Sequence, residues 1–127
     1  MSFQRVKLGK VGEDLAAVFL QKNGYKIIQR NFKNNLGEID IIAKEDKTVC
    51  FVEVKTRTSD YFGEPVLAIS PFKQRKLSQV ALSYLKNHHL MHASARFDIV
   101  SITNDPSGKQ EIEVLKNAFE LSAPFAY

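Results

Sequence analysis

The hydrophobic positions of this chain recur with two different periods, which predict an alternation of helices and strands. Apolar residues recur at helical spacing before residue 24 and again after residue 71. The first set is Leu8, Val11, Leu15, Val18 and Phe19, and the second is Leu77, Val80, Ala81 and Leu85. Gly24 is a natural stop for the first helix, while Ser70 and Pro71 suit the N-cap and the first position of the second.

Five other segments have the β-branched and alternating character of strands. They are residues 25–32, 37–42, 49–55, 95–102 and 111–115. The order along the chain is therefore helix, three strands, helix, two strands. This order predicts a three-layer α/β arrangement around a mixed sheet. A chain of 127 residues with 44% apolar residues is expected to form one domain over residues 1–127.

Charged residues interrupt two strands that otherwise look buried. Glu53 and Lys55 lie in the segment 49–55, and Glu38 and Asp40 lie in the segment 37–42. Burying an unpaired carboxylate costs several kcal/mol, so charge in such strands needs an explanation. Two consecutive strands with this anomaly suggest a functional site.

The short polar segment 44–48 predicts a hairpin turn between these strands. With Asp46 and Lys47 at its tip, Asp40 lies opposite Glu53, and Glu38 lies opposite Lys55. Directly opposed side chains share a face of the sheet, with Cβ atoms about 4.5–5.5 Å apart, and like charges so placed repel. A positive group is therefore expected between Asp40 and Glu53.

A divalent metal ion fits this arrangement best. Mg²⁺ favours carboxylate oxygens and water, and one or two carboxylates usually hold it together with substrate phosphate. We therefore expect Asp40 and Glu53 to be metal ligands for Mg²⁺, with Mn²⁺ as a substitute. Lys55 could steady an attacking water or the charge that develops on the phosphate. The plainer alternative is a surface hairpin whose acids pair with Lys55 and Arg57.

The same residues resemble a known nuclease signature. Ile39-Asp40 followed by Glu53-Val54-Lys55 resembles the PD-(D/E)XK motif, with isoleucine in place of proline. Over nearly the whole chain, the pattern resembles the YraN-like family of predicted endonucleases, which is similar to archaeal Holliday junction resolvases. The segments that carry this resemblance are residues 12–16, 24–25, 30–32, 37–40, 51–57 and 96–98.

This resemblance implies a restriction-endonuclease-like fold, a Mg²⁺ site and a branched or duplex DNA substrate. It also implies that a glutamate of the first helix joins the motif acids, and Glu13 matches that position. An acid in the first turns of a helix is also favoured by the helix macrodipole, which needs no active site. Both interpretations of Glu13 stay open from the residues alone.

Basic residues gather at the start of the second helix. The net charge is +4, from 18 basic and 14 acidic residues. Lys73, Arg75 and Lys76 fall in first turns, where the macrodipole opposes cations, so an anionic partner such as a DNA backbone is a reasonable expectation. Gln74 resembles a polar helix residue that some related nucleases place near the scissile phosphate. The alternative is an ordinary solvated helix face.

Arg57 could contact phosphate or pair with Glu38. Tyr61 and Phe62, in the loop after the third strand, could stack on unpaired bases or pack into the core. The residues do not decide between these alternatives.

Several classes of protein do not fit the sequence. There is no apolar stretch long enough for a transmembrane segment and no hydrophobic signal core, so a cytoplasmic protein without a membrane partner is expected. Residues 9–12 lack the strand and the Gly-Lys-Ser/Thr ending of a phosphate-binding P-loop, so no nucleotide cofactor is expected. The single cysteine, Cys50, lies in a predicted buried strand and suits packing.

The leading hypothesis is a Mg²⁺-dependent endonuclease that acts on DNA, with branched structures as candidate substrates. By analogy it would act as a homodimer, because one site cuts one strand at a time. The alternatives are a catalytically inactive nucleic-acid-binding module that kept the fold, and an interaction domain without a nucleic-acid partner.

Overall fold

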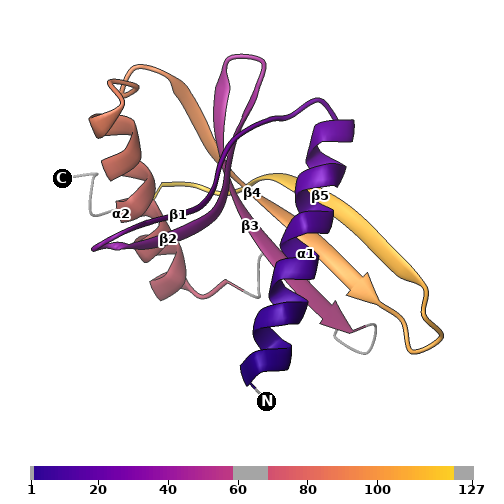
Figure 1. Cartoon of the computed structure of the whole chain (residues 1–127). Helices are drawn as coiled ribbons and strands as arrows, with labels where there is room; N and C mark the ends of the chain where they lie inside the picture. Colours follow the sequence, from indigo (N-terminus) through magenta and orange to yellow (C-terminus); the bar gives the residue numbers. More distant parts are fainter. Residues whose placement is uncertain (1, 59–68, 122–127) are drawn as a thin grey trace.

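The computed structural model describes residues 2–58 and 69–121, with side chains from residue 9 onward. Tyr61 and Phe62 lie outside these ranges. The elements are α1 (Ser2–Lys22), β1 (Lys26–Asn34), β2 (Gly37–Glu45), β3 (Thr48–Thr58), α2 (Pro71–Asn87), β4 (Ser94–Asn104) and β5 (Gln110–Phe119). Their order is the predicted one, and Figure 1 shows their arrangement. Neither helix of the described ranges is long and apolar enough to cross a membrane.

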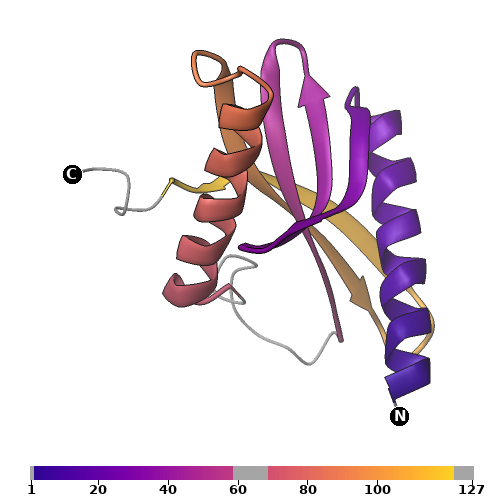
Figure 2. The same ribbon diagram turned by 60° about the vertical axis from the view of Figure 1, so that its left-hand side comes forward.

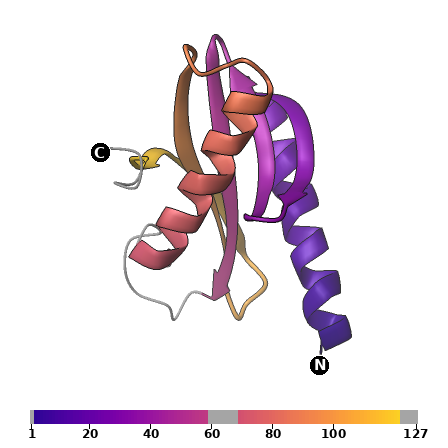
Figure 3. The same ribbon diagram turned by 90° about the vertical axis from the view of Figure 1, so that its left-hand side faces the viewer.

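The strands form one mixed sheet in the order β1-β2-β3-β4-β5. All neighbouring pairs are antiparallel except β3 and β4, which run parallel. Two parallel strands need a long crossover, and α2 lies between β3 and β4 in the chain. The sheet separates α2 from α1, as Figures 2 and 3 show from two further directions.

Each helix covers one face of the sheet. The α2 residues Leu77, Val80, Ala81, Tyr84 and Leu85 pack in one buried cluster with Phe51, Phe97 and Ile99 of the sheet. The α1 residues Ala16, Ala17 and Leu20 pack in a second cluster with Ile41, Val52 and Val100. The predicted fold class is confirmed as a three-layer α/β arrangement, in which two helices flank a mixed sheet.

The apolar face of α1 differs from the predicted one. Val11 and Val18 are about half exposed, whereas Ala16 and Leu20 are fully buried. A close approach explains the difference, because a Cβ on Gly12 would lie 2.7 Å from Thr56 Oγ1 of β3. Small residues let the helix backbone come near the sheet, and this rotates the larger valines outward.

The helix boundaries follow the predicted signals. Gly24 has a φ of +92°, a conformation that glycine adopts without strain, and it follows the end of α1. Ser70 caps α2, since its Oγ accepts a hydrogen bond from Lys73 N at 3.1 Å, and Pro71 is the first helical residue.

The hairpin of β2 and β3 has the predicted register as far as it extends. Glu45 pairs with Thr48 around a two-residue tip, and the paired residues run to Ile41 with Val52. They stop there, so the ladder includes neither Asp40 with Glu53 nor Glu38 with Lys55, the two pairs that the sequence predicted. The reason lies in Asp40, whose Oδ2 accepts the Val54 N–H at 2.8 Å where a continued ladder would use a backbone carbonyl.

Both β1 and β2 change faces at this level. Ile39 packs in the cluster against α2, but Ile41 packs in the cluster against α1, although residues two apart in a regular strand share a face. Asp40 lies between them. It therefore stands at the point where β2 twists, next to both faces of the sheet.

The neighbouring strand makes the same change. Phe32 packs edge-to-face on Tyr84 of α2, whereas Arg30 reaches Glu13 of α1. Asn31, between them, has a φ of +54°. Asparagine tolerates this left-handed conformation better than most residues, so it permits the sharp twist beside Asp40.

Candidate active site

Asp40 and Glu53 form a buried acid pair at the point where β2 and β3 separate. Their carboxyl groups are hydrogen bonded to each other. The Glu53 side chain is only 10% exposed. Burial, together with the charge of Asp40, raises the pKa of Glu53 to about 7, and burial is also the main cause that raises the pKa of Asp40. Both shifts favour the protonated form of the pair.

Two lysines from different elements approach this acid pair. Lys73 Nζ lies 3.6 Å from Glu53 Oε2, and Lys55 Nζ lies 3.9 Å from the same oxygen. Lys55 comes from β3 and Lys73 from the first turn of α2. Both charges lower the pKa of Glu53 against the larger effects of burial and of Asp40. Lys73, predicted as a contact to the DNA backbone, thus lies directly at the acids.

The donor set fits a hard divalent cation. It consists of two carboxylates, and one oxygen of Asp40 is already occupied by the Val54 N–H. Within residues 9–58 and 69–121, no three His, Cys, Asp or Glu side chains are grouped closely enough to hold a metal ion. Mg²⁺ is commonly held by one or two carboxylates, with water and substrate phosphate completing its shell. Two acids suffice for such a site, whereas a closed protein cage would need more.

Glu13 lies near the pair without joining it. Its Oε1 accepts a hydrogen bond from Arg30 Nε at 3.1 Å, and Arg30 also pairs with Asp14. Glu13 and Asp40 line one hollow of about 480 Å³ between α1 and the twisted strands. The structure therefore brings Glu13 to the rim of the site, bound to an arginine, and does not bring it into a three-acid cluster.

A second hollow lies on the other side of Glu38. It has a volume of about 280 Å³ and is bounded by α2 and by the turn between β1 and β2. Glu38 lines both hollows, and Lys73 lines the second. Of the acid pair, Asp40 lines the first hollow, and the second reaches the pair only through Lys73, which contacts Glu53.

The other predicted nucleic-acid contacts are dispersed over α2 and β3. Gln74 Nε2 donates to Ile69 O at 3.0 Å, which holds the start of α2 rather than pointing to the acids. Arg75 is exposed, and Lys76 Nζ lies 5.7 Å from the centroid of the Phe72 ring. Arg57 lines a different groove, with Val11 and Ile102.

Sequence reasoning missed the role of Asn31. The only local signal is that asparagine suits regular strands poorly, which hints at an irregularity in β1. It predicted Lys73 as a contact to DNA but not as a neighbour of Glu53, because the helix pattern gives no information about which sheet residue faces its first turn.

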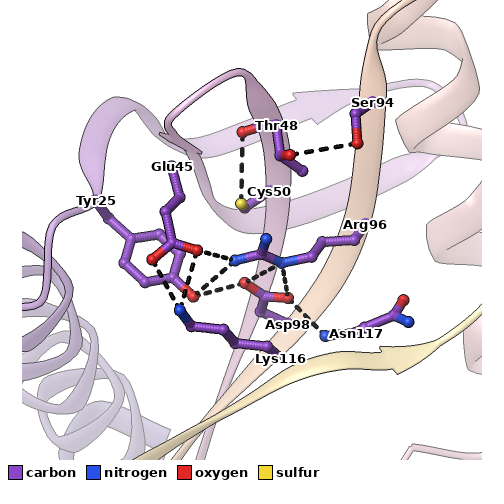
Figure 4. Close-up of polar contacts among 9 residues, drawn as sticks. All are labelled: Tyr25, Glu45, Thr48, Cys50, Ser94, Arg96, Asp98, Lys116 and Asn117. Atoms are coloured by element: carbon purple, nitrogen blue, oxygen red, sulfur yellow. Dashed lines mark hydrogen bonds and ion pairs between the residues drawn. The ribbon is translucent and has the colours of Figure 1, made fainter.

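A separate polar cluster surrounds Asp98 on the other side of β3, and Figure 4 shows its contacts. Tyr25 Oη donates to Asp98 Oδ2 at 2.8 Å, and Arg96 Nε donates to Oδ1 at 2.9 Å. The backbone N–H of Asn117 completes the set at 2.9 Å. The hydrogen-bonding shell of the Asp98 carboxylate is filled, as the role of a structural acid requires.

Comparison with known proteins shows the family. A model of the Uncharacterised protein family UPF0102 matches residues 12–102. A UPF0102 protein of Geobacter metallireducens is 50% identical over 96% of this chain and 99% of its own length. Others from Syntrophus aciditrophicus and Caldicellulosiruptor saccharolyticus are 45% and 46% identical, over 94% and 89% of this chain and 93% and 97% of their own lengths.

The fold and the site together define a three-layer α/β protein with a buried acid pair and two lysines at one point of a mixed sheet. The chain belongs to the UPF0102 family. Among solved structures, that of Pyrococcus furiosus SfsA in complex with Ca²⁺ is similar, with a TM-score of 0.40 and 11% identity. The match covers 87% of this chain and 62% of that one, and a likeness at this level carries no argument about function.

Proposed function

We propose that this protein is a Mg²⁺-dependent endonuclease that cleaves DNA phosphodiester bonds. The observation that carries the proposal is the convergence of Asp40, Glu53 and Lys55 at one buried point. Charge of this kind in a sheet interior is costly and is typical of functional sites. The resemblance of these residues to the PD-(D/E)XK signature and to the YraN-like endonucleases agrees with it.

Each residue has a distinct task in this proposal. Asp40 and Glu53 would hold Mg²⁺, or Mn²⁺ in its place, and the Val54 N–H keeps the Asp40 carboxylate oriented. The metal would supply a Lewis acid that stabilises charge on the phosphate and lowers the pKa of a bound water. Lys55 would stabilise the negative charge that develops on the phosphate. Glu13, held by Arg30, would orient groups that enter the large hollow.

Basic residues on α2 would position the DNA. Lys73, Arg75 and Lys76 carry positive charge on the first turns of the helix, and Lys73 lies next to the acid pair. Phosphate contacts of this kind position DNA without reading its sequence. Arg57, in a separate groove, and Gln74, at the start of α2, are further candidates for contacts to DNA. Branched DNA as the substrate follows from the family resemblance, and a homodimeric enzyme and a cytoplasmic location belong to the same proposal.

The test is cleavage of labelled junction, flap, duplex and single-stranded DNA by wild type and by Lys55→Ala, with Mg²⁺, Mn²⁺ or a chelator. We expect metal-dependent products from wild type and a loss of about 10²–10³-fold in Lys55→Ala, since one electrostatic contact to the transition state is removed. Glu111→Gln, on exposed β5, is the matched control and should cleave normally. Equal cleavage by Lys55→Ala would exclude the assigned chemistry.

The competing function is a nucleic-acid-binding module without catalysis. One observation favours it: Lys55 and Lys73 already balance much of the negative charge of the pair without a metal. Its signature would be salt-dependent DNA binding that survives Asp40→Ala, with no cleavage by wild type.

A further inference from the structure

The hollow between α2 and the β1–β2 turn has the features of a nucleobase site. Its closed end is formed where the turn meets the helix, because a Cβ on Gly37 would lie 3.2 Å from Val80 Cγ2. Leu36 lines it from the turn, and Lys73 and Lys76 line it from the helix. An apolar wall and two cations thus share one cavity of about 280 Å³.

An exposed aromatic ring, that of Phe72, does not line this hollow but lies under Lys76, which does. Phe72 is 62% exposed, although a phenylalanine side chain is stabilised by burial. It is one helical turn before Lys76, whose Nζ lies over its ring, so the two share a face of α2. Leu36 is also exposed, at 39%. Exposed aromatic residues interleaved with cations are what single-stranded nucleic acids bind, since bases stack on the rings and phosphates pair with the cations.

The position of this ring relates it to the acid pair. Lys73, the residue after Phe72, contacts Glu53. If a DNA phosphate were bound at the acid pair, the adjacent nucleotide would therefore lie beside the first turn of α2. Glu38 also lines the hollow and would repel a phosphate there. A neutral base is consequently the better occupant of the hollow, with its phosphates toward the lysines.

We propose that Phe72 and this hollow bind an unstacked base next to the phosphate held at the acid pair. In a continuous duplex every base is paired and stacked between its neighbours, so it has no free face for a ring. The site would therefore select DNA with an unpaired nucleotide beside the bond to be cut, such as a flap or a single strand. The inference rests on the proposed nuclease function for the position of the phosphate.

The test compares binding of a fully paired duplex, of the same duplex with a single-stranded flap, and of the single strand alone. Fluorescence anisotropy in chelator, at fixed salt, measures the dissociation constant without cleavage. Phe72→Ala should weaken binding of the flap and the single strand by about 5- to 150-fold, the loss of one stacked base. Binding of the duplex should change by less than about twofold.

Two further variants serve as controls. Phe72→Tyr keeps an aromatic face and should bind the flap as wild type does. Met91→Ala removes a comparably exposed apolar side chain, 58% exposed, in the connection from α2 to β4, and should change nothing. No loss in Phe72→Ala, an equal loss on duplex and flap, or the same loss in Met91→Ala would overturn the proposal.

These outcomes are separate from those of the nuclease proposal. Suppose that flap binding depends on Phe72 but that wild type never cleaves with Mg²⁺ or Mn²⁺. This result would support the base site and exclude the nuclease function. Suppose instead that wild type cleaves with metal and that Phe72→Ala changes neither cleavage nor DNA binding on any substrate. This result would support the nuclease function and exclude the base site.

Discussion

Two buried acidic groups on this sheet lie in opposite chemical situations. Asp98 is fully buried and accepts hydrogen bonds from Tyr25, Arg96 and the backbone of Asn117. Burial, and then the hydrogen bond to Asp98, raise the pKa of Tyr25, which keeps this phenol a donor. Arg96 extends the cluster to Glu45 at 2.6 Å. Every charge in this cluster has a partner within hydrogen-bond distance.

The pair of Asp40 and Glu53 has far fewer donors. One backbone N–H and a hydrogen bond between the two carboxyls are its close contacts, and the lysines lie 3.6 and 3.9 Å away. A fully bonded buried acid suits a structural role, whereas an acid pair with few donors suits the cation site proposed above. Both regions hold a buried acid, and the completeness of their hydrogen bonding is what differs.

Removal of the Asp98 carboxylate should have the largest effect. Asp98→Ala leaves Arg96 and Tyr25 without their buried partner, and loss of one member of such a pair costs about 3–5 kcal/mol. Urea denaturation at pH 7.5 measures it. Glu111→Gln, an exposed acid, should change the free energy of unfolding by less than about 0.5 kcal/mol. If Asp98→Ala lowered the free energy of unfolding by no more than Glu111→Gln does, the contrast between the Asp98 cluster and the acid pair would be lost.

Mg²⁺ should stabilise the protein through the acid pair alone. At a hundredfold excess over its dissociation constant, the metal should add about 2.7 kcal/mol to the free energy of unfolding of wild type. Glu53→Gln removes a ligand and should lose most of this gain. Thermal unfolding with and without Mg²⁺ measures both, with Glu111→Gln as the control that keeps the gain. Equal stabilisation of Glu53→Gln would place the metal elsewhere.

The metal-free protein should lose stability as the pH rises toward and through 7. The pKa of Glu53 is about 7 in the folded protein and ordinarily 4.5, so the folded state binds this proton more tightly than the unfolded state. Its contribution is complete below pH 4.5 and is lost as the pH passes 7, by about 3 kcal/mol.

In chelator, Glu53→Gln should therefore be more stable than wild type at pH 8, and this difference should shrink toward pH 5. Denaturation curves at several pH values would show it. If Glu53→Gln were instead less stable than wild type at pH 8, the ionised carboxylates of the pair would have enough hydrogen-bond donors, as the Asp98 carboxylate has.

The twist beside Asp40 should respond to Asn31 with a smaller change. Asn31→Val places a β-branched residue at a φ of +54° and should cost about 1–2 kcal/mol, whereas Asn31→Gly should cost less, because glycine adopts this φ freely. Urea denaturation compares the two. A greater loss for glycine would show that the asparagine side chain, rather than its backbone conformation, supports the twist.

Much of the fold could be read from periodicity and turn chemistry. The element order, the N-cap at Ser70 and the register of the β2–β3 hairpin are local features. A two-residue tip determines which residues lie opposite one another, and this is why Asp40 and Glu53 could be paired in advance. Val11 and Val18 were assigned to the wrong face, because helical spacing alone could not show how closely Gly12 approaches Thr56.

What the chain determined by itself was therefore the local pairing: strand register, helix ends, and two acids brought to one level of the sheet. Only the tertiary structure brought Lys73 of α2 to those acids, bound Glu13 to Arg30, and surrounded Asp98 with donors from the α1–β1 connection, β4 and β5. The physical reason is the range of the interactions. Register follows from bonds between near neighbours, whereas the hydrogen-bonding shell of a buried charge depends on how distant elements pack.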